Sequence, residues 1–339
     1  MFSATLFFSS CTSNTKKEQK KTKTETDIDS LLNINPNDVN LLAKRSNKSF
    51  AKFLKTANIE DLYKSKQDAA KAFRLDSNNY EARMAYAEAL SRTPNLTSQE
   101  LNNVYRHYNW LLSKKKTAKV YVGLASYYSF IQNPEKGIEL TDKALRIDKK
   151  YRDAYIMKAR LFLQLQKPDL AISSYETAVQ QDNSFLAAYM KLGQLYTEQE
   201  KYPIALERFR NVTLLNSQLP EAWYGVAMSH QMMNENKQAL DNYRQLMRVD
   251  PTFYLGYFNM GWVKQYRENQ IDSALFFYSK SLDITPDFVK AHHNIGLCYE
   301  EKKDISRALV SYGKALKYNP NYELSKQRVK ELKKHVYEK

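Results

Sequence analysis

The side chains best suited to metal binding or nucleophilic catalysis are few in this chain of 339 residues. Its five histidines stand at none of the spacings that metal sites use; they are His107, His230, His292, His293 and His335. Cys298 has no CxxC partner and is most simply a small core residue. The sequence also contains no glycine-rich phosphate loop and no nucleophile elbow. We therefore predict no catalytic residue, no metal and no cofactor, and nothing in the sequence argues for an enzyme.

The second cysteine, Cys11, follows a short apolar N-terminus, residues 1–10, with the sequence MFSATLFFSS. Phe8, Ser9, Ser10 and Cys11 resemble the lipobox of a bacterial lipoprotein signal. This resemblance implies that Cys11 becomes the mature N-terminus and carries the lipid. The basic n-region of a secretory signal is absent, and Phe8 stands where such signals usually have an aliphatic residue. The alternative is a disordered N-terminus with an incidental cysteine.

The segment that follows Cys11 is rich in Lys, Thr and Glu and has no large apolar residue before Ile28. Such a composition cannot bury enough surface to fold. We predict a lipidated cysteine and a disordered tether over residues 11–38, between a membrane anchor and a folded body. No apolar run in the sequence has the length of a transmembrane helix.

Composition favours a helical protein with anionic partners. Eight glycines and nine prolines are too few for an all-β chain full of tight turns, and abundant Leu, Ala, Lys, Glu and Tyr favour helix. The formal net charge is +15. On charge alone, nucleic acid, an acidic protein and an anionic membrane surface are all possible partners.

The elements that would position binding residues recur along the chain at intervals of about 34 residues. In residues 289–320, one face of a first helix carries His292, Ile295, Gly296 and Tyr299. A second helix follows with Ala308, Tyr312 and Ala315 on one face, and Pro320 ends it. Five earlier units, beginning at Tyr121, repeat the constellation, and the unit that begins at Tyr257 is one residue longer. His292 occupies a packing position, which indicates an interior histidine.

These units resemble the tetratricopeptide repeat family, whose pattern of large, apolar, small and aromatic residues they share. The resemblance implies an all-α fold, a right-handed α-solenoid of about eight helix pairs. We expect two irregular pairs over residues 39–117, six regular repeats over residues 118–322, and a capping helix and tail over residues 323–339. The capping helix would cover the apolar face of the last repeat, with Leu324, Leu332 and Val336 on one side.

In this family the first helices of successive repeats line a concave groove. Carried onto this chain, the resemblance implies these groove residues: Arg160, Met190, Gln194, Tyr224, Met228, Phe258, Asn259, Trp262, His293 and Asn294. Aromatic and methionine side chains at such positions suit a docked peptide or helix. Asn259 and Asn294 also resemble two rungs of the asparagine ladder found in sugar-transferring relatives. The alternative is that the stripe packs on itself in a tight superhelix.

Three classes of function follow from these observations. The leading hypothesis is a non-catalytic scaffold, lipid-anchored at a bacterial cell envelope, that binds protein or peptide partners, acidic ones included, and no small-molecule substrate. The second is a basic α-solenoid that binds nucleic acid in the cytoplasm. The third is an enzyme that uses the repeats for recruitment, but helices from about Val39 to the end leave no room for a catalytic domain.

Overall fold

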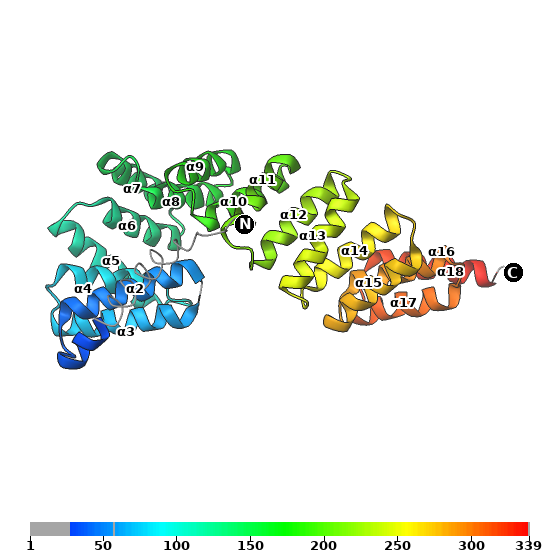
Figure 1. The fold of residues 1–339 in the computed structure, drawn as a ribbon, viewed down its shortest axis with the longest axis horizontal. Helices are drawn as coiled ribbons and strands as arrows, with labels where there is room; N and C mark the ends of the chain where they lie inside the picture. The colour runs from blue at the N-terminus through cyan, green and yellow to red at the C-terminus, as the bar shows by residue number, and fades with distance from the viewer. Residues whose placement is uncertain (1–27, 57, 338–339) are drawn as a thin grey trace, which may run out of the picture. The chain divides into compact units, whose positions relative to one another are not determined.

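The computed structural model describes residues 28–56 and 58–337, which are helical apart from short connections (Figure 1). Cys11, the lipobox-like residues and most of the predicted tether lie outside the described residues. The helices are α2 (Val39–Thr56), α3 (Ile59–Leu75), α4 (Tyr80–Ser91), α5 (Ser98–Lys114), α6 (Ala118–Phe130), α7 (Pro134–Ile147), α8 (Arg152–Gln164), α9 (Pro168–Gln181), α10 (Leu186–Glu198), α11 (Tyr202–Leu215), α12 (Pro220–Met232), α13 (Asn236–Val249), α14 (Tyr254–Tyr266), α15 (Ile271–Ile284), α16 (Val289–Glu301), α17 (Ile305–Tyr318) and α18 (Glu323–Tyr337).

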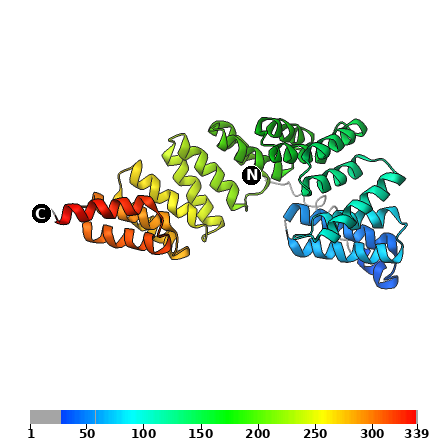
Figure 2. The ribbon, with the colours of Figure 1, turned by 180° about the vertical axis from the view of Figure 1, so that it is seen from behind.

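The chain separates into two compact units, Met1–Ser174 and Tyr175–Lys339, and α9 contains the boundary. In the first unit, α2 packs on α3, α4 on α5 and α6 on α7. In the second unit, which Figure 2 shows from behind, the pairs are α10 with α11, α12 with α13, α14 with α15 and α16 with α17, and α18 packs on α17. This confirms the predicted all-α solenoid of helix pairs with a capping helix.

One left-handed residue marks the turn inside each regular helix pair. These residues have φ between 52° and 61° and are Gln132, Gln166, Glu200, Asn234, Asn269 and Lys303, at intervals of 34, 34, 34, 35 and 34 residues. Asn95, with φ of 54°, marks the same turn in an irregular pair. A left-handed residue after a helix lets the chain reverse and satisfies the last carbonyls. The single interval of 35 confirms the extra residue predicted for the unit that begins at Tyr257.

Helix starts in the first unit use side-chain caps that the sequence supplies. Asn58, Asn79 and Thr117 each accept a hydrogen bond from a backbone N–H in the first turn of the helix that follows. Thr97 and Glu100 form a capping box at the start of α5. Asn58 and Thr97 thereby fix the starts of α3 and α5, the 17-residue second helices of the two irregular pairs.

The core between helices combines small residues with large rings. Ala205, Ala239, Ala274 and Ala308 are fully buried at one equivalent position of four second helices. Tyrosine side chains fill the space beside three of them and are also fully buried: Tyr243, Tyr278 and Tyr312. Apolar burial of this kind is the main stabilising contribution to each helix pair.

The structure corrects two details at the ends of the solenoid. Residues 28–34, which were predicted as part of the tether, form a helix in which Leu32 is 5% exposed and packs with Leu42. The alternation of apolar and polar residues is too short there to show a helix in the sequence. In α18, Leu324 is 57% exposed, whereas Ser325 is buried at 0% and Leu332 at 7%, because the helix is rotated from the predicted face.

None of the helices in residues 28–56 and 58–337 combines the length and the apolar character needed to cross a bilayer.

Candidate partner-binding surface on the first helices

First helices of successive pairs lie side by side, and they carry all ten predicted groove residues. In the first unit α4 contacts α6 and α6 contacts α8; in the second, α10 contacts α12. Side-chain hydrogen bonds join α12 to α14 and α14 to α16. Side chains on these helices therefore form a continuous layer within each unit. Arg160 belongs to the first unit and the other nine residues to the second.

Tyr224, Met228 and Asn259 form one connected patch on α12 and α14. The side-chain amide of Asn259 donates to the hydroxyl of Tyr224 at 3.1 Å and contacts the sulfur of Met228 at 3.2 Å. Asn259 is only 8% exposed, while Tyr224 and Met228 are half-buried. Burial raises the pKa of Tyr224, so this phenol stays protonated and neutral at physiological pH. Asn259 therefore positions the patch rather than presenting a free amide to a ligand.

An aromatic and cationic cluster lies at the C-terminal end of α14. The rings of Trp262 and Tyr266 are 5.3 Å apart, and the guanidinium of Arg267 lies 5.2 Å from the Trp262 ring. Trp262 is half-buried and Tyr266 is 46% exposed. Aromatic and arginine side chains in this state are typical anchors for a protein partner. The sequence prediction missed Tyr266 and Arg267, although Trp262 and Tyr266 are four residues apart on one helix face.

Phe258, also on α14, was predicted to face a partner in the groove, but its ring packs on other aromatic rings of the solenoid. Its ring lies 5.5 Å from that of Tyr278 and 5.0 Å from that of Phe288. Phe258 therefore joins successive helix pairs as well as facing the first-helix layer. Phe258 therefore fits, in part, the alternative that the aromatic stripe packs on itself.

His293 and Asn294 are withdrawn from the surface, which corrects their prediction as groove residues. His293 is 7% exposed, hydrogen-bonds through Nδ1 to the hydroxyl of Ser325 at 3.0 Å, and packs against Tyr322. Asn294, 9% exposed, donates to the hydroxyl of Tyr278 at 3.1 Å. The cause for His293 is the capping helix: Ser325 lies on α18 and Tyr322 just before it. Asn294 is withdrawn because its side chain is bonded to Tyr278, a buried tyrosine of the preceding helix pair.

Met190 and Gln194 lie on α10. Met190 is half-buried against the cluster of Ala205, Leu206 and Phe209. Gln194 is exposed and accepts a hydrogen bond of 3.0 Å from Lys191. Only Gln194 is freely accessible to a partner here, with the edge of Met190 beside it.

Charged side chains from the first helices of the first unit lie close together. Lys119 on α6 forms an ion pair of 2.8 Å with Glu88 on α4. Burial raises the pKa of Glu88, and Lys119 partly opposes that shift. Burial and then the charge of Arg160 lower the pKa of Arg92, while Arg160 itself is exposed on α8. The sequence pattern gave no sign of Arg92, because it lies at the helix end, outside the repeat positions.

Two residues with potential chemistry are structural. His292 is 7% exposed, its Nε2 lies 2.8 Å from the carbonyl oxygen of Pro286, and its ring stacks on Tyr318. Cys298 is fully buried beside Ala274, and burial raises the pKa of its thiol to about 12. A thiol in that state is a poor nucleophile at neutral pH. The sequence analysis interpreted both residues as interior, and the structure buries both.

Comparison with known proteins agrees with this architecture. Models of the tetratricopeptide repeat match residues 156–207 and 289–322. The structure resembles the C-terminal part of a tetratricopeptide repeat-containing protein from Cytophaga hutchinsonii, with a TM-score of 0.60, 16% identity, and coverage of 72% of this chain and 98% of the other. At that identity the likeness concerns the fold alone.

Two curated relatives share part of the chain. The uncharacterized protein ycf37 of Pyropia yezoensis is 34% identical over 95 residues, which are 28% of this chain and 53% of the relative. The chloroplastic tetratricopeptide repeat domain-containing protein PYG7 of Arabidopsis thaliana is 29% identical over 79 residues, 23% of this chain and 26% of the relative. The match thus spans about half of one relative and a quarter of the other.

Fold, surface and matches define a class. The chain is an α-solenoid with tetratricopeptide repeats detected at residues 156–207 and 289–322. Solenoids of stacked helix pairs present extended surfaces.

Proposed function

We propose that the chain is a non-catalytic scaffold that binds a peptide or helix of a partner protein on the first helices of its second unit. The observation that carries this proposal is the Trp262, Tyr266 and Arg267 cluster, which is partly exposed although the neighbouring repeat core is closed. Contiguous exposed aromatic surface marks interaction sites, and Trp, Tyr and Arg are the residues most enriched among the anchors of protein interfaces. The half-buried Tyr224 and Met228 extend the same layer on α12.

The proposal includes a membrane anchor. Cys11 would carry a lipid, and the Lys- and Thr-rich residues after it would link the anchor to the solenoid. The lipobox resemblance of residues 8–11 supports this part, and so does the composition of the segment that follows.

A pull-down from native cell extract tests the binding surface. Trp262→Ala should lower recovery of the partner at least tenfold, because truncating an aromatic anchor that the partner covers costs about 2 kcal/mol or more. Phe276→Ala on α15, a residue 56% exposed and away from the first helices, is the matched control and should leave recovery unchanged. Equal recovery with Trp262→Ala and wild type would refute the surface.

Labelled palmitate and cell fractionation test the anchor. Wild type should incorporate label and sediment with membranes, whereas Cys11→Ser should do neither. An unlabelled, cytosolic wild-type protein would refute the anchor. It would then favour the second candidate, a basic α-solenoid that binds nucleic acid, for which the net charge of +15 is the supporting observation.

A further inference from the structure

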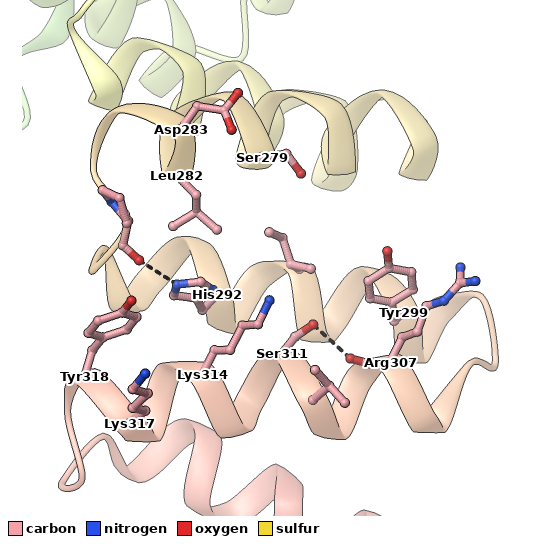
Figure 3. Close-up of a pocket in the computed structure, with 13 residues that line it drawn as sticks. Ser279, Leu282, Asp283, His292, Tyr299, Arg307, Ser311, Lys314, Lys317 and Tyr318 are labelled. Atoms are coloured by element: carbon pink, nitrogen blue, oxygen red, sulfur yellow. Dashed lines mark hydrogen bonds between the residues drawn. The ribbon is translucent and has the colours of Figure 1, made fainter.

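A second concave site lies on the other layer of the second unit, between the second helices. A cleft of about 590 Å³ separates α15 from α17, and α16 forms its floor (Figure 3). Leu282, Ile295 and Val310 give the cleft an apolar lining, and Val310 is 58% exposed. None of the predicted groove residues lines this cleft.

The rim of the cleft is positively charged. Arg307, Lys314 and Lys317, all on α17, line it, and Lys314 reaches from α17 toward the floor helix (Figure 3). Within the described part of the chain, Lys314 and Lys317 have no carboxylate at ion-pair distance. The one acidic residue that lines the cleft, Asp283, is already paired with Lys280 at 3.3 Å. Arg307 has a carboxylate neighbour in Asp304, at 3.4 Å. The positive charge that the described chain leaves without a counter-charge at the cleft is therefore that of Lys314 and Lys317.

The repeat architecture does not require these cations. Counted from the left-handed turn residue of each repeat, the positions equivalent to Arg307, Lys314 and Lys317 are Gln238, Gln245 and Arg248 on α13, and Ile204, Asn211 and Leu214 on α11. On α15 they are Ser273, Lys280 and Asp283. Three cations at these positions occur in α17 and in none of the other second helices of the second unit. The charge is thus a property of this cleft and not of helix-pair packing.

We propose that this cleft binds a short acidic segment of a partner protein. An apolar side chain of that segment would lie against Leu282, Ile295 and Val310, and carboxylates on either side of it would pair with Lys314 and Arg307. The volume falls within the range of ligand pockets, and charge-assisted hydrogen bonds to carboxylates are the strongest that such a rim can make. A bilayer surface suits the site less well, because it is too flat to place an apolar group on a recessed floor. The scaffold would then hold two partners, one on each layer of the second unit.

Selection from a random heptapeptide library on the full-length chain tests the proposal. Bound peptides should be enriched in Asp and Glu flanking Leu, Ile or Phe. A labelled peptide from the selection should bind the Arg307→Gln/Lys314→Gln variant about tenfold more weakly. Lys237→Gln/Arg244→Gln on α13 removes the same charge outside the cleft and should change the affinity by less than about twofold.

Val310→Asp provides an independent variant, because its side chain is 58% exposed and the fold does not depend on it. It should also weaken binding, because the added carboxylate repels the acidic segment at the apolar lining. Selected peptides without acidic enrichment, or equal binding to the Arg307→Gln/Lys314→Gln variant, would overturn the proposal. So would binding to phosphatidylserine vesicles that is lost in that variant while no acidic peptide is selected.

Discussion

The side-chain amide of Asn294 donates a hydrogen bond of 3.1 Å to the hydroxyl of Tyr278, and that hydroxyl donates one of 2.9 Å to Gln265. The three residues lie on α16, α15 and α14, so a single phenol joins two successive helix pairs. Tyr243 donates to Gln231 at 2.7 Å in the same way one pair earlier. An asparagine at the position of a peptide-binding ladder is here part of the solenoid's own packing.

Removing the hydroxyl of Tyr278 should destabilise the second unit. Tyr278→Phe leaves the buried amide of Asn294 without its acceptor, and such a loss costs about 1–3 kcal/mol in the free energy of unfolding. Urea titration followed by circular dichroism measures it. Tyr318→Phe, at a ring 45% exposed, should cost less than about 0.5 kcal/mol. Equal effects of the two changes would show that the buried hydroxyl does not stabilise the fold.

Gly296 and Gly313 form a matched pair for the close packing of helices. A Cβ on Gly296 would lie 2.5 Å from the ring of Tyr312, whereas one on Gly313 meets nothing within 4 Å. Gly296→Ala should therefore destabilise by about 1–3 kcal/mol. Gly313→Ala, in the middle of α17, should stabilise by about 0.5–1 kcal/mol through helix propensity. Thermal unfolding of both variants checks the opposite signs, and a shift in the same direction would contradict the packing.

Glu200 occupies a left-handed conformation, with φ of 57°, in the turn between α10 and α11. An L-residue pays about 1 kcal/mol for this conformation and glycine does not. Glu200→Gly should thus stabilise the protein by up to about 1 kcal/mol. Lys191→Gly within α10 should destabilise by about 0.5–1 kcal/mol. A loss of stability with Glu200→Gly, measured in urea, would refute the turn geometry.

His107 should make stability fall in acid. Its ring packs at 4.9 Å against Phe73 and 5.3 Å against Tyr86, and burial, with the charge of Arg83, lowers its pKa from 6.5 to about 4. The unfolded chain therefore binds a proton at higher pH than the folded chain does. The contribution of the neutral imidazole is complete above about pH 6.5 and is lost as the pH falls toward 4. His107→Phe should flatten this part of the stability profile, and an unchanged slope between pH 6.5 and 4 would contradict the assignment.

The sequence alone was sufficient for the architecture because one local rule repeats. A small residue opposite a large ring, as in Gly296 with Tyr312, and a turn every 34 residues involve only neighbouring helices. No long-range pairing had to be guessed. The extra residue before Asn269 could be found because it displaces all later positions by one.

The surface was harder to predict, because exposure depends on what the next element covers. His293 and Met190 hold the same position in their repeats, ten residues before the left-handed turn residue, but Ser325 and Tyr322 cover only His293. The charged group around Glu88 and Arg92 combines these two residues of an irregular repeat, where the family's register does not apply, with Lys119 and Arg160 of the regular repeats. The helix at residues 28–34 depends on its contact with Leu42, and a short segment does not show such a contact in its own sequence.

Site-specific photo-crosslinking in living cells tests the central claim most directly. A benzoylphenylalanine at position 266, on the exposed ring of the Trp262 cluster, should form a discrete adduct with a partner protein, and Trp262→Ala in the same chain should abolish it. The same probe at Leu214, a residue 83% exposed on α11, should yield no such adduct. Identical adducts from both positions, or an adduct at position 266 that survives Trp262→Ala, would contradict a partner-binding surface on the first helices.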